Sequence, residues 1–105
     1  MNTSKNNSFD AIEKIIEEEG LRIETVDIHP ELDVMLIVLN TKVVLRQMLS
    51  SFPRLKNADK NKLLQYELIA SGTGVHWKML DEDLSLKGFL QEELRKTIKG
   101  NELAA

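Results

Sequence analysis

The continuous apolar run Val34-Met35-Leu36-Ile37-Val38-Leu39 decides how the rest of this sequence is interpreted. A strand without any polar residue is typical of the centre of a sheet, where both faces are covered. Asn40-Thr41 follows as a short turn, and Lys42 to Arg46 returns as the second strand of a hairpin. We expect this hairpin to form the middle of the sheet.

A helix and a further strand are predicted before the hairpin. Ser8 to Glu19 begins with a good N-cap residue and carries apolar residues at helical spacing, and Gly20 follows where a left-handed C-cap would end a helix. Leu21 to Ile28 is typical of a strand. Its apolar parity breaks between Ile23 and Val26, which predicts a bulge or an edge position.

A second strand pair is predicted later in the chain. Leu64 to Ala70 alternates between apolar and polar residues, and a glycine-rich turn connects it to Val75 to Leu80. In this last strand we expect Val75, Trp77 and Met79 to share one face. The tryptophan is expected to pack in the core.

The remaining segments are helical or irregular. Gln47 to Ser51 is predicted as a short helical turn. It should end ahead of Phe52-Pro53, because the residue before a proline avoids the helical region. Arg54 to Asn61 is expected to be a turn-rich connector. Ser85 is a good N-cap for a last helix that we expect to end at Gly100.

The order of elements predicts an α+β domain with a small antiparallel or mixed sheet of about five strands. The N-terminal helix, the short middle helix and the C-terminal helix complete the order α-β-β-β-α-β-β-α. Residues 8–100 are expected to form one domain, between a disordered tail over 1–7 and a flexible tail over 101–105.

The composition predicts an ordinary cytoplasmic protein. The 105 residues, 42% of them hydrophobic and 30% charged, leave room for one domain that needs no metal or disulfide. The absence of cysteine excludes disulfides, thiolate catalysis and zinc–sulfur sites, and favours a reducing compartment. The N-terminus is too polar for a signal peptide, and the longest apolar run is too short to span a membrane.

No recognisable catalytic or metal-binding pattern is present, so we expect no enzyme activity and no cofactor. His29 precedes a proline at a strand end, and His76 is expected to face away from Trp77 and the core. Neither has the spacing or the partners of a metal site. The segment from Asp81 to Glu92 has oxygen-bearing side chains at several calcium-loop positions, but Leu86 stands where the sharp turn needs glycine.

The order of these signals, from Ile23 to Leu94, resembles the bacterial domain-of-unknown-function family 2442. The residues that carry the resemblance are Asn40-Thr41, Met48-Leu49, Phe52-Pro53-Arg54-Leu55, Val75-His76-Trp77 and Asp83-Leu84-Ser85. This chain departs from the family pattern in its Asn-Thr turn, which replaces Asp-Gly, and in its added N-terminal helix. The resemblance implies a small α+β domain with a non-catalytic regulatory or antitoxin-like role, since many members are encoded next to a small toxin-like protein.

We therefore expect a protein-interaction module that covers a partner's surface. The candidate partner-binding residues are the acidic Glu13, Glu17 and Glu18 of the first helix, together with His76 and Lys78 on the sheet. A basic partner, such as a small toxin encoded nearby, would associate faster with a surface of negative charge. Self-association into a homodimer, through the first helix or an edge strand, is also expected.

Two alternatives from other classes stay open. The first is a transcriptional regulator that touches DNA phosphates through Arg54, Lys56, Lys60 and Lys62. The net charge of −3 argues against it, because phosphate contacts supply much of the affinity of DNA-binding proteins. The second is a small-ligand-binding domain or enzyme that uses His76 and Asp81.

Overall fold

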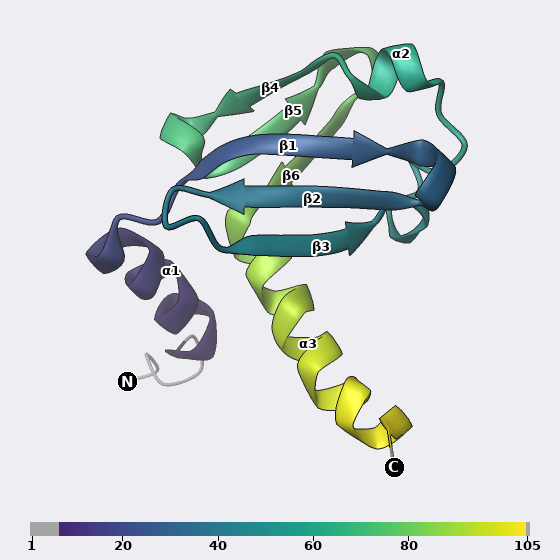
Figure 1. The fold of residues 1–105 in the computed structure, drawn as a ribbon. Coiled ribbons are helices and arrows are strands. Elements are labelled where there is room, and N and C mark those ends of the chain that lie inside the picture. Colours follow the sequence, from purple (N-terminus) through teal and green to yellow (C-terminus); the bar gives the residue numbers. More distant parts are fainter. Residues whose placement is uncertain (1–6, 105) are drawn as a thin grey trace.

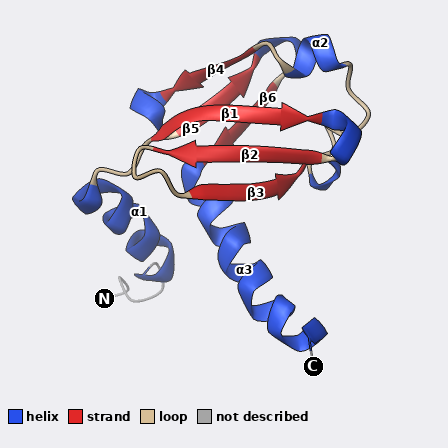
Figure 2. Ribbon diagram, viewed as in Figure 1, coloured by secondary structure: helices blue, strands red, loops and turns tan. Residues whose placement is uncertain are grey.

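Two small antiparallel sheets lie one behind the other in the computed structural model, which describes residues 7–104 (Figures 1 and 2). Each sheet has three strands in sequence order, β1-β2-β3 and β4-β5-β6. The strands are β1 Ile23–His29, β2 Val34–Leu39, β3 Val44–Met48, β4 Tyr66–Ile69, β5 Gly74–Trp77 and β6 Glu82–Ser85. The helices are α1 Asn7–Glu19, α2 Lys60–Leu63 and α3 Leu86–Ala104, with 3₁₀ turns η2 Pro30–Leu32, η3 Leu49–Ser51, η4 Ala70–Gly72 and η5 Lys78–Leu80.

The predicted α+β class is confirmed, and the strand count is six in two sheets where about five in one were expected. The additional strand is β6, which pairs with β5 from Gly74↔Ser85 to Trp77↔Glu82. Its sequence, Glu82-Asp83-Leu84-Ser85, is too polar to be recognised as a strand, since only Leu84 is apolar. Leu84 is the residue of β6 that packs against the core, and the strand is held in place by its pairing with β5.

The core fills the space between the sheets. Trp77 is fully buried there, as predicted, and its indole N–H donates to the carbonyl of Leu63 over 2.9 Å. Phe89 of α3 and Ile16 of α1 close the core at one end. The buried hydrophobic residues of the strands are Ile23, Val26, Ile28, Met35, Ile37, Leu39, Leu45, Val75 and Trp77.

One prediction about β2 is wrong, because only one of its faces is covered by a second layer. Met35 and Ile37 are fully buried between the sheets, whereas Val34, Leu36 and Val38 alternate with them and are only half-buried. In Figure 1 no described helix or strand lies in front of this outer face.

The two sheets are joined at the edge of β1 by the side chain of Tyr66. The backbone N–H of Val26 donates to the tyrosine hydroxyl over 3.1 Å, and the hydroxyl donates to the carbonyl of Val26 over 3.0 Å. The predicted bulge is present, since the β1–β2 register shifts between Ile23 and Thr25. Both polar backbone groups of Val26 at the free edge are therefore occupied.

Two hairpin loops share one design, a 3₁₀ turn followed by an aspartate in the left-handed conformation. Asp33 follows η2 with φ 56°, and Asp81 follows η5 with φ 51°. Because the chain reverses directly after Trp77, Met79 lies in the turn and is 55% exposed. The expectation that Met79 shares the buried face of Val75 is therefore wrong.

Helix ends follow the sequence signals in two of four cases. The N-cap expected at Ser8 is wrong, since α1 already includes Asn7 and Ser8. Gly20 has φ +63° after α1, where the N–H of Leu21 donates to the carbonyl of Ile16 over 2.9 Å, as a left-handed cap requires. The hydroxyl of Ser85 accepts the N–H of Gly88 over 3.0 Å and caps α3. The end expected at Gly100 is wrong, since α3 continues to Ala104. An isolated glycine costs a helix only about 1 kcal/mol relative to alanine.

The middle of the chain contains the predicted turn and one unpredicted helix. Of the helical turn expected over Gln47 to Ser51, Leu49 to Ser51 form the 3₁₀ turn η3, whereas Gln47 and Met48 are the last two residues of β3. The connector expected from Arg54 to Asn61 runs into the short helix α2, which buries Leu63. Of the tail expected at 1–7, residues 1–6 lie outside the described part of the chain, and Asn7 is the first residue of α1.

Candidate functional site

His76 and Lys78 are brought together, as the sequence suggested, in a shallow hollow of about 270 Å³ on the outer side of the second sheet. His76 lies between Glu67 and Asp83 on the neighbouring strands. Its Nδ1 atom forms a hydrogen bond with Asp83 Oδ1. The imidazole faces away from the core as predicted, and it already has a carboxylate partner within the protein.

The acidic residues of the first helix lie elsewhere, on α1. The carboxylate of Glu13 forms an ion pair of 3.0 Å with Lys87 of α3, so it helps to hold the two helices together. Glu17 and Glu18 are exposed near the C-terminal end of α1. Of the three glutamates, these two are the better placed to meet a partner.

An apolar groove of about 330 Å³ separates α1 from α3. Ile15 of α1 and Leu94 of α3 line it and are 52% and 59% exposed. Figure 1 shows why, since α3 runs away from the sheets and only α1 accompanies it. The other lining residues are Ile12, Leu21, Leu90, Glu93 and Thr97.

The sequence of α1 contains a signal of the groove. Ile15 and Ile16 are adjacent, so their side chains leave the helix about 100° apart and cannot both point to the centre of the same core. Ile16 is buried, so Ile15 remains at the side of the helix. Glu93 also lines the groove, and its Oε1 atom, which accepts no hydrogen bond, lies 3.3 Å from Lys96 Nζ as an ion pair.

The four basic residues of the DNA hypothesis occupy the connector and α2. Arg54 Nη1 lies 3.4 Å from Asp81 Oδ2, and this exposed ion pair offsets part of the positive charge. Lys56 lines a cavity of about 280 Å³ beside the connector, and Lys60 and Lys62 are exposed on α2. DNA binding through these residues stays a prediction.

The ligand hypothesis required His76 and Asp81 to act together. In the structure each of these two side chains contacts a different residue. His76 contacts Asp83, whereas Asp81 contacts Arg54. The calcium-loop pattern is also not realised, since Asp83 and Ser85 lie in the extended strand β6. Within residues 7–104 no group of three or more His, Asp or Glu side chains is placed to hold a metal ion.

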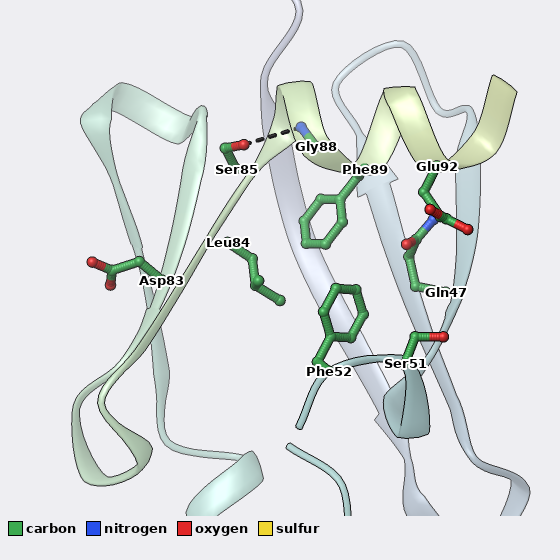
Figure 3. Close-up of a pocket in the computed structure, with 9 residues that line it drawn as sticks. All are labelled: Gln47, Ser51, Phe52, Asp83, Leu84, Ser85, Gly88, Phe89 and Glu92. Carbon is green, nitrogen blue, oxygen red and sulfur yellow. Dashed lines mark hydrogen bonds between the residues drawn. The ribbon is translucent and has the colours of Figure 1, made fainter. Parts of the chain in front are cut away.

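A cavity of about 510 Å³ opens between β3, η3, β6 and the start of α3 (Figure 3). Phe52 and Phe89 meet edge to face within it, with ring centroids 6.3 Å apart and planes at 88°. Gln47 is only 2% exposed and lies beside Glu92 in the view. The remaining lining residues are Ser51, Asp83, Leu84, Ser85 and Gly88.

Sequence reasoning missed this cavity, although β3 contained a clue. Gln47 has the same parity as Leu45 and therefore points to the core side of its strand. A polar side chain at such a position is a signal of an internal polar site. Asp83 borders the cavity but points away from the other side chains in Figure 3.

No helix of the described chain is long and apolar enough to cross a membrane. None of the curated proteins matches the sequence. Two solved structures have a similar fold. A solution NMR structure of an uncharacterised protein from Chromobacterium violaceum aligns with a TM-score of 0.64 and 24% identity, covering 100% of this chain and 97% of that one.

The second is the crystal structure of a protein of unknown function from Rhodospirillum rubrum. It aligns with a TM-score of 0.62 and 24% identity, covering 69% of this chain and 87% of the other. At this level of identity the two structures establish the fold alone. Residues 23–94 match the sequence profile of the family described as "Protein of unknown function (DUF2442)", from the start of β1 into α3. The chain therefore belongs to the DUF2442 family.

Proposed function

We propose that this protein is a non-catalytic, antitoxin-like interaction module of the cytoplasm that binds a basic protein partner in the groove between α1 and α3. The observation that carries the proposal is the apolar character of this groove. Five of its seven lining residues are isoleucine or leucine, the sixth is Thr97, and only Glu93 is charged. Apolar surface that collects in a concave site is typical of partner-binding surfaces.

The shape of the groove favours an amphipathic helical segment as the ligand. Two helices already form its walls, so a third helix can lay an apolar stripe between them. Ile15 and Leu94, each more than half exposed, would lose most of their remaining contact with water. Complete burial of such a side chain contributes about 1.5–3 kcal/mol.

The charge next to the groove favours a basic partner. Glu18 and Glu19 lie three and four residues after Ile15 and are therefore its neighbours on the surface of α1. They also lie at the C-terminal end of the helix, where the helix dipole adds negative potential. A lysine or arginine side chain from a partner would neutralise the charges of Glu18 and Glu19 and interact favourably with the negative end of the helix dipole.

A designed peptide provides a direct test. An amphipathic helical peptide with leucine on one face and lysine on the other should bind the protein, as measured by fluorescence anisotropy. A peptide in which glutamate replaces each lysine should not bind. Leu94→Lys should weaken binding at least about tenfold, because it removes apolar contact and repels the peptide. The matched control is Met79→Lys, since Met79 is 55% exposed and lies in η5, outside the groove.

Equal affinity of the two variants for the basic peptide would contradict the groove as the binding surface. The antitoxin-like character needs a separate experiment in the native host. The product of the adjacent reading frame should co-purify with the wild type and should be lost with Leu94→Lys. If that product inhibits growth, wild-type protein should restore growth and the variant should not.

The cavity of Figure 3 favours a second candidate function, the binding of a small polar ligand. Its Gln47, Ser51 and Glu92 side chains offer hydrogen-bonding groups beside the Phe52–Phe89 pair. A ligand specific to the folded protein must raise its melting temperature. No shift across a panel of small metabolites would leave protein binding as the only function with structural support.

A further inference from the structure

No described helix or strand covers the outer face of the first sheet, which β1, β2 and β3 form (Figure 1). Val34, Leu36 and Val38 of β2 form its centre and are half-buried. Val44 and Met48 of β3 flank them and are 49% and 52% exposed. The sequence of β2 is that of a strand covered on both faces, yet the fold covers only one.

Charge is arranged across this face in a definite order. The strand register places Asp27 of β1, Leu36 of β2 and Arg46 of β3 in one row. Their neighbours along each strand are buried, so all three side chains point outward. The row therefore reads negative, apolar, positive across the sheet, and its ends lie about 10 Å apart, two strand spacings.

Neither charge is fully satisfied within the protein. Asp27 uses one carboxylate oxygen to bind Nε2 of His29 over 2.9 Å. Arg46 makes no side-chain ion pair within the part of the chain that the structure describes. A guanidinium group prefers a carboxylate partner that it can contact through two N–H groups.

We propose that a second copy of this chain docks face to face on the first sheet, with a two-fold axis parallel to β2. Such an axis places β1 of each copy opposite β3 of the other. Asp27 of one copy then meets Arg46 of its partner, and the symmetry produces this ion pair twice. Leu36 meets its own counterpart in the centre, and the half-buried valines of β2 pack around it.

The charge row selects this arrangement over its alternative. A two-fold axis perpendicular to the strands would place Asp27 opposite Asp27 and Arg46 opposite Arg46, which is unfavourable on both sides. Both axes keep the strands of the two sheets roughly aligned, as in the common packing of twisted sheets, so the charges and not the strand direction decide between them. A free edge is not needed, which is consistent with Tyr66 occupying the edge of β1 at Val26.

The face is small, so the dimer should be weak. Three short strands cover less than the roughly 800 Å² per partner that stable complexes bury. We expect dissociation constants in the range of about 10 μM to 1 mM, which are typical of interfaces of that class. This inference concerns a surface distinct from the helix groove and does not depend on the function proposed above.

Sedimentation equilibrium of the full chain between about 10 μM and 1 mM tests the proposal by charge exchange. The wild type should shift from monomer to dimer with concentration. D27R and R46D should each weaken association at least about tenfold, because each creates two like-charge contacts. The double variant D27R/R46D reverses the row and should restore association to within a few-fold of the wild type.

Two controls separate this surface from others and from misfolding. Leu94→Lys in the helix groove should leave the dimer unchanged, and circular dichroism should show that both charge variants are folded. A wild type that stays monomeric up to 1 mM would overturn the proposal. An association that D27R and R46D leave intact, or that the double variant fails to restore, would overturn it as well.

Discussion

The two sheets differ on the sides that face away from each other, although their inner sides contribute to one core. The outer row of the first sheet is Asp27, Leu36 and Arg46, an apolar centre between opposite charges. The corresponding row of the second sheet consists of Glu67, His76 and Asp83, which are polar throughout. A similar strand arrangement thus carries one surface suited to contact and one suited to water.

This difference separates stability from recognition in the molecule. Inner residues such as Trp77 and Ile37 are fully buried and hold the sheets together. Outer residues contribute little to the core, so they can differ between the two sheets without loss of stability. The second sheet presents only polar residues in its outer row, whereas the first sheet presents the apolar Leu36 at the centre of its row.

The largest expected loss of stability follows from a substitution on the inner side of the second sheet. Trp77→Ala should lower the free energy of unfolding by about 3–5 kcal/mol, because it opens a cavity and leaves the Leu63 carbonyl without its donor. Chemical denaturation measures the loss. The adjacent His76→Ala, on the outer side, should cost at most about 1 kcal/mol, the net value of one hydrogen bond. Equal losses would contradict the distinction between the two sides.

A smaller loss should follow from loosening the joint between the sheets. Tyr66→Phe keeps the ring but removes the hydroxyl that serves both backbone groups of Val26. Unpaired groups of this kind cost about 1–3 kcal/mol when they are buried, and the partly exposed setting favours the lower half of that range. Amide hydrogen exchange at Val26 should also accelerate. Unchanged exchange there would show that the joint is not needed to protect the edge of β1.

The connection between the second sheet and α3 should contribute less. Ser85→Ala removes the cap that accepts the Gly88 N–H and should cost about 1 kcal/mol. Ser85→Asp should retain most of that stability, because aspartate caps helices equally well. Thermal or denaturant unfolding compares the three proteins. If the aspartate variant is no more stable than the alanine variant, Ser85 contributes through packing and not as a cap.

The smallest expected effect concerns His29, at the end of the first sheet. The hydrogen bond to Asp27, with the charges of Asp27 and Glu31, raises the pKa of His29 above its ordinary value of 6.5. The protonated form is therefore favoured by folding. Its contribution should be complete below pH 6.5 and should be lost as the pH rises through the raised pKa of the folded protein.

NMR titration of the imidazole measures this pKa directly, and unfolding experiments on both sides of it measure the linked stability. Asp27→Asn removes the carboxylate and should return the pKa of His29 toward 6.5. The stability change should be small, because the pair is exposed to solvent. An unchanged pKa in the variant would assign the shift to a group other than Asp27.

Much of the fold could be predicted where a local signal decides the structure. Gly20, Ser85 and the parity break after Ile23 each predicted the feature that the structure has at that place. These features depend on the backbone preferences of a few neighbouring residues. The division into two sheets could not be predicted, because it depends on which strands meet in space and on an edge strand, Glu82 to Ser85, with a single apolar residue.

The candidate site could be predicted less well than the fold. The acidic end of α1 is predicted from the sequence as a contact surface and stays a prediction, whereas the apolar groove beside it depends on how α3 leaves the sheets. Leu94 belongs to the apolar stripe of the last helix, but the sequence of that helix does not indicate whether another element covers the stripe. His76 and Lys78 do share one hollow as proposed, but the same strand pairing also supplies His76 with Asp83.

The most direct test of the account is a methyl and imidazole NMR titration of the protein with the basic amphipathic peptide. The account predicts progressive shifts for the methyl groups of Ile15, Leu90 and Leu94, which line the groove, and none for the imidazole of His76. Shifts at His76 with unchanged groove methyls would place the partner on the second sheet and contradict the account.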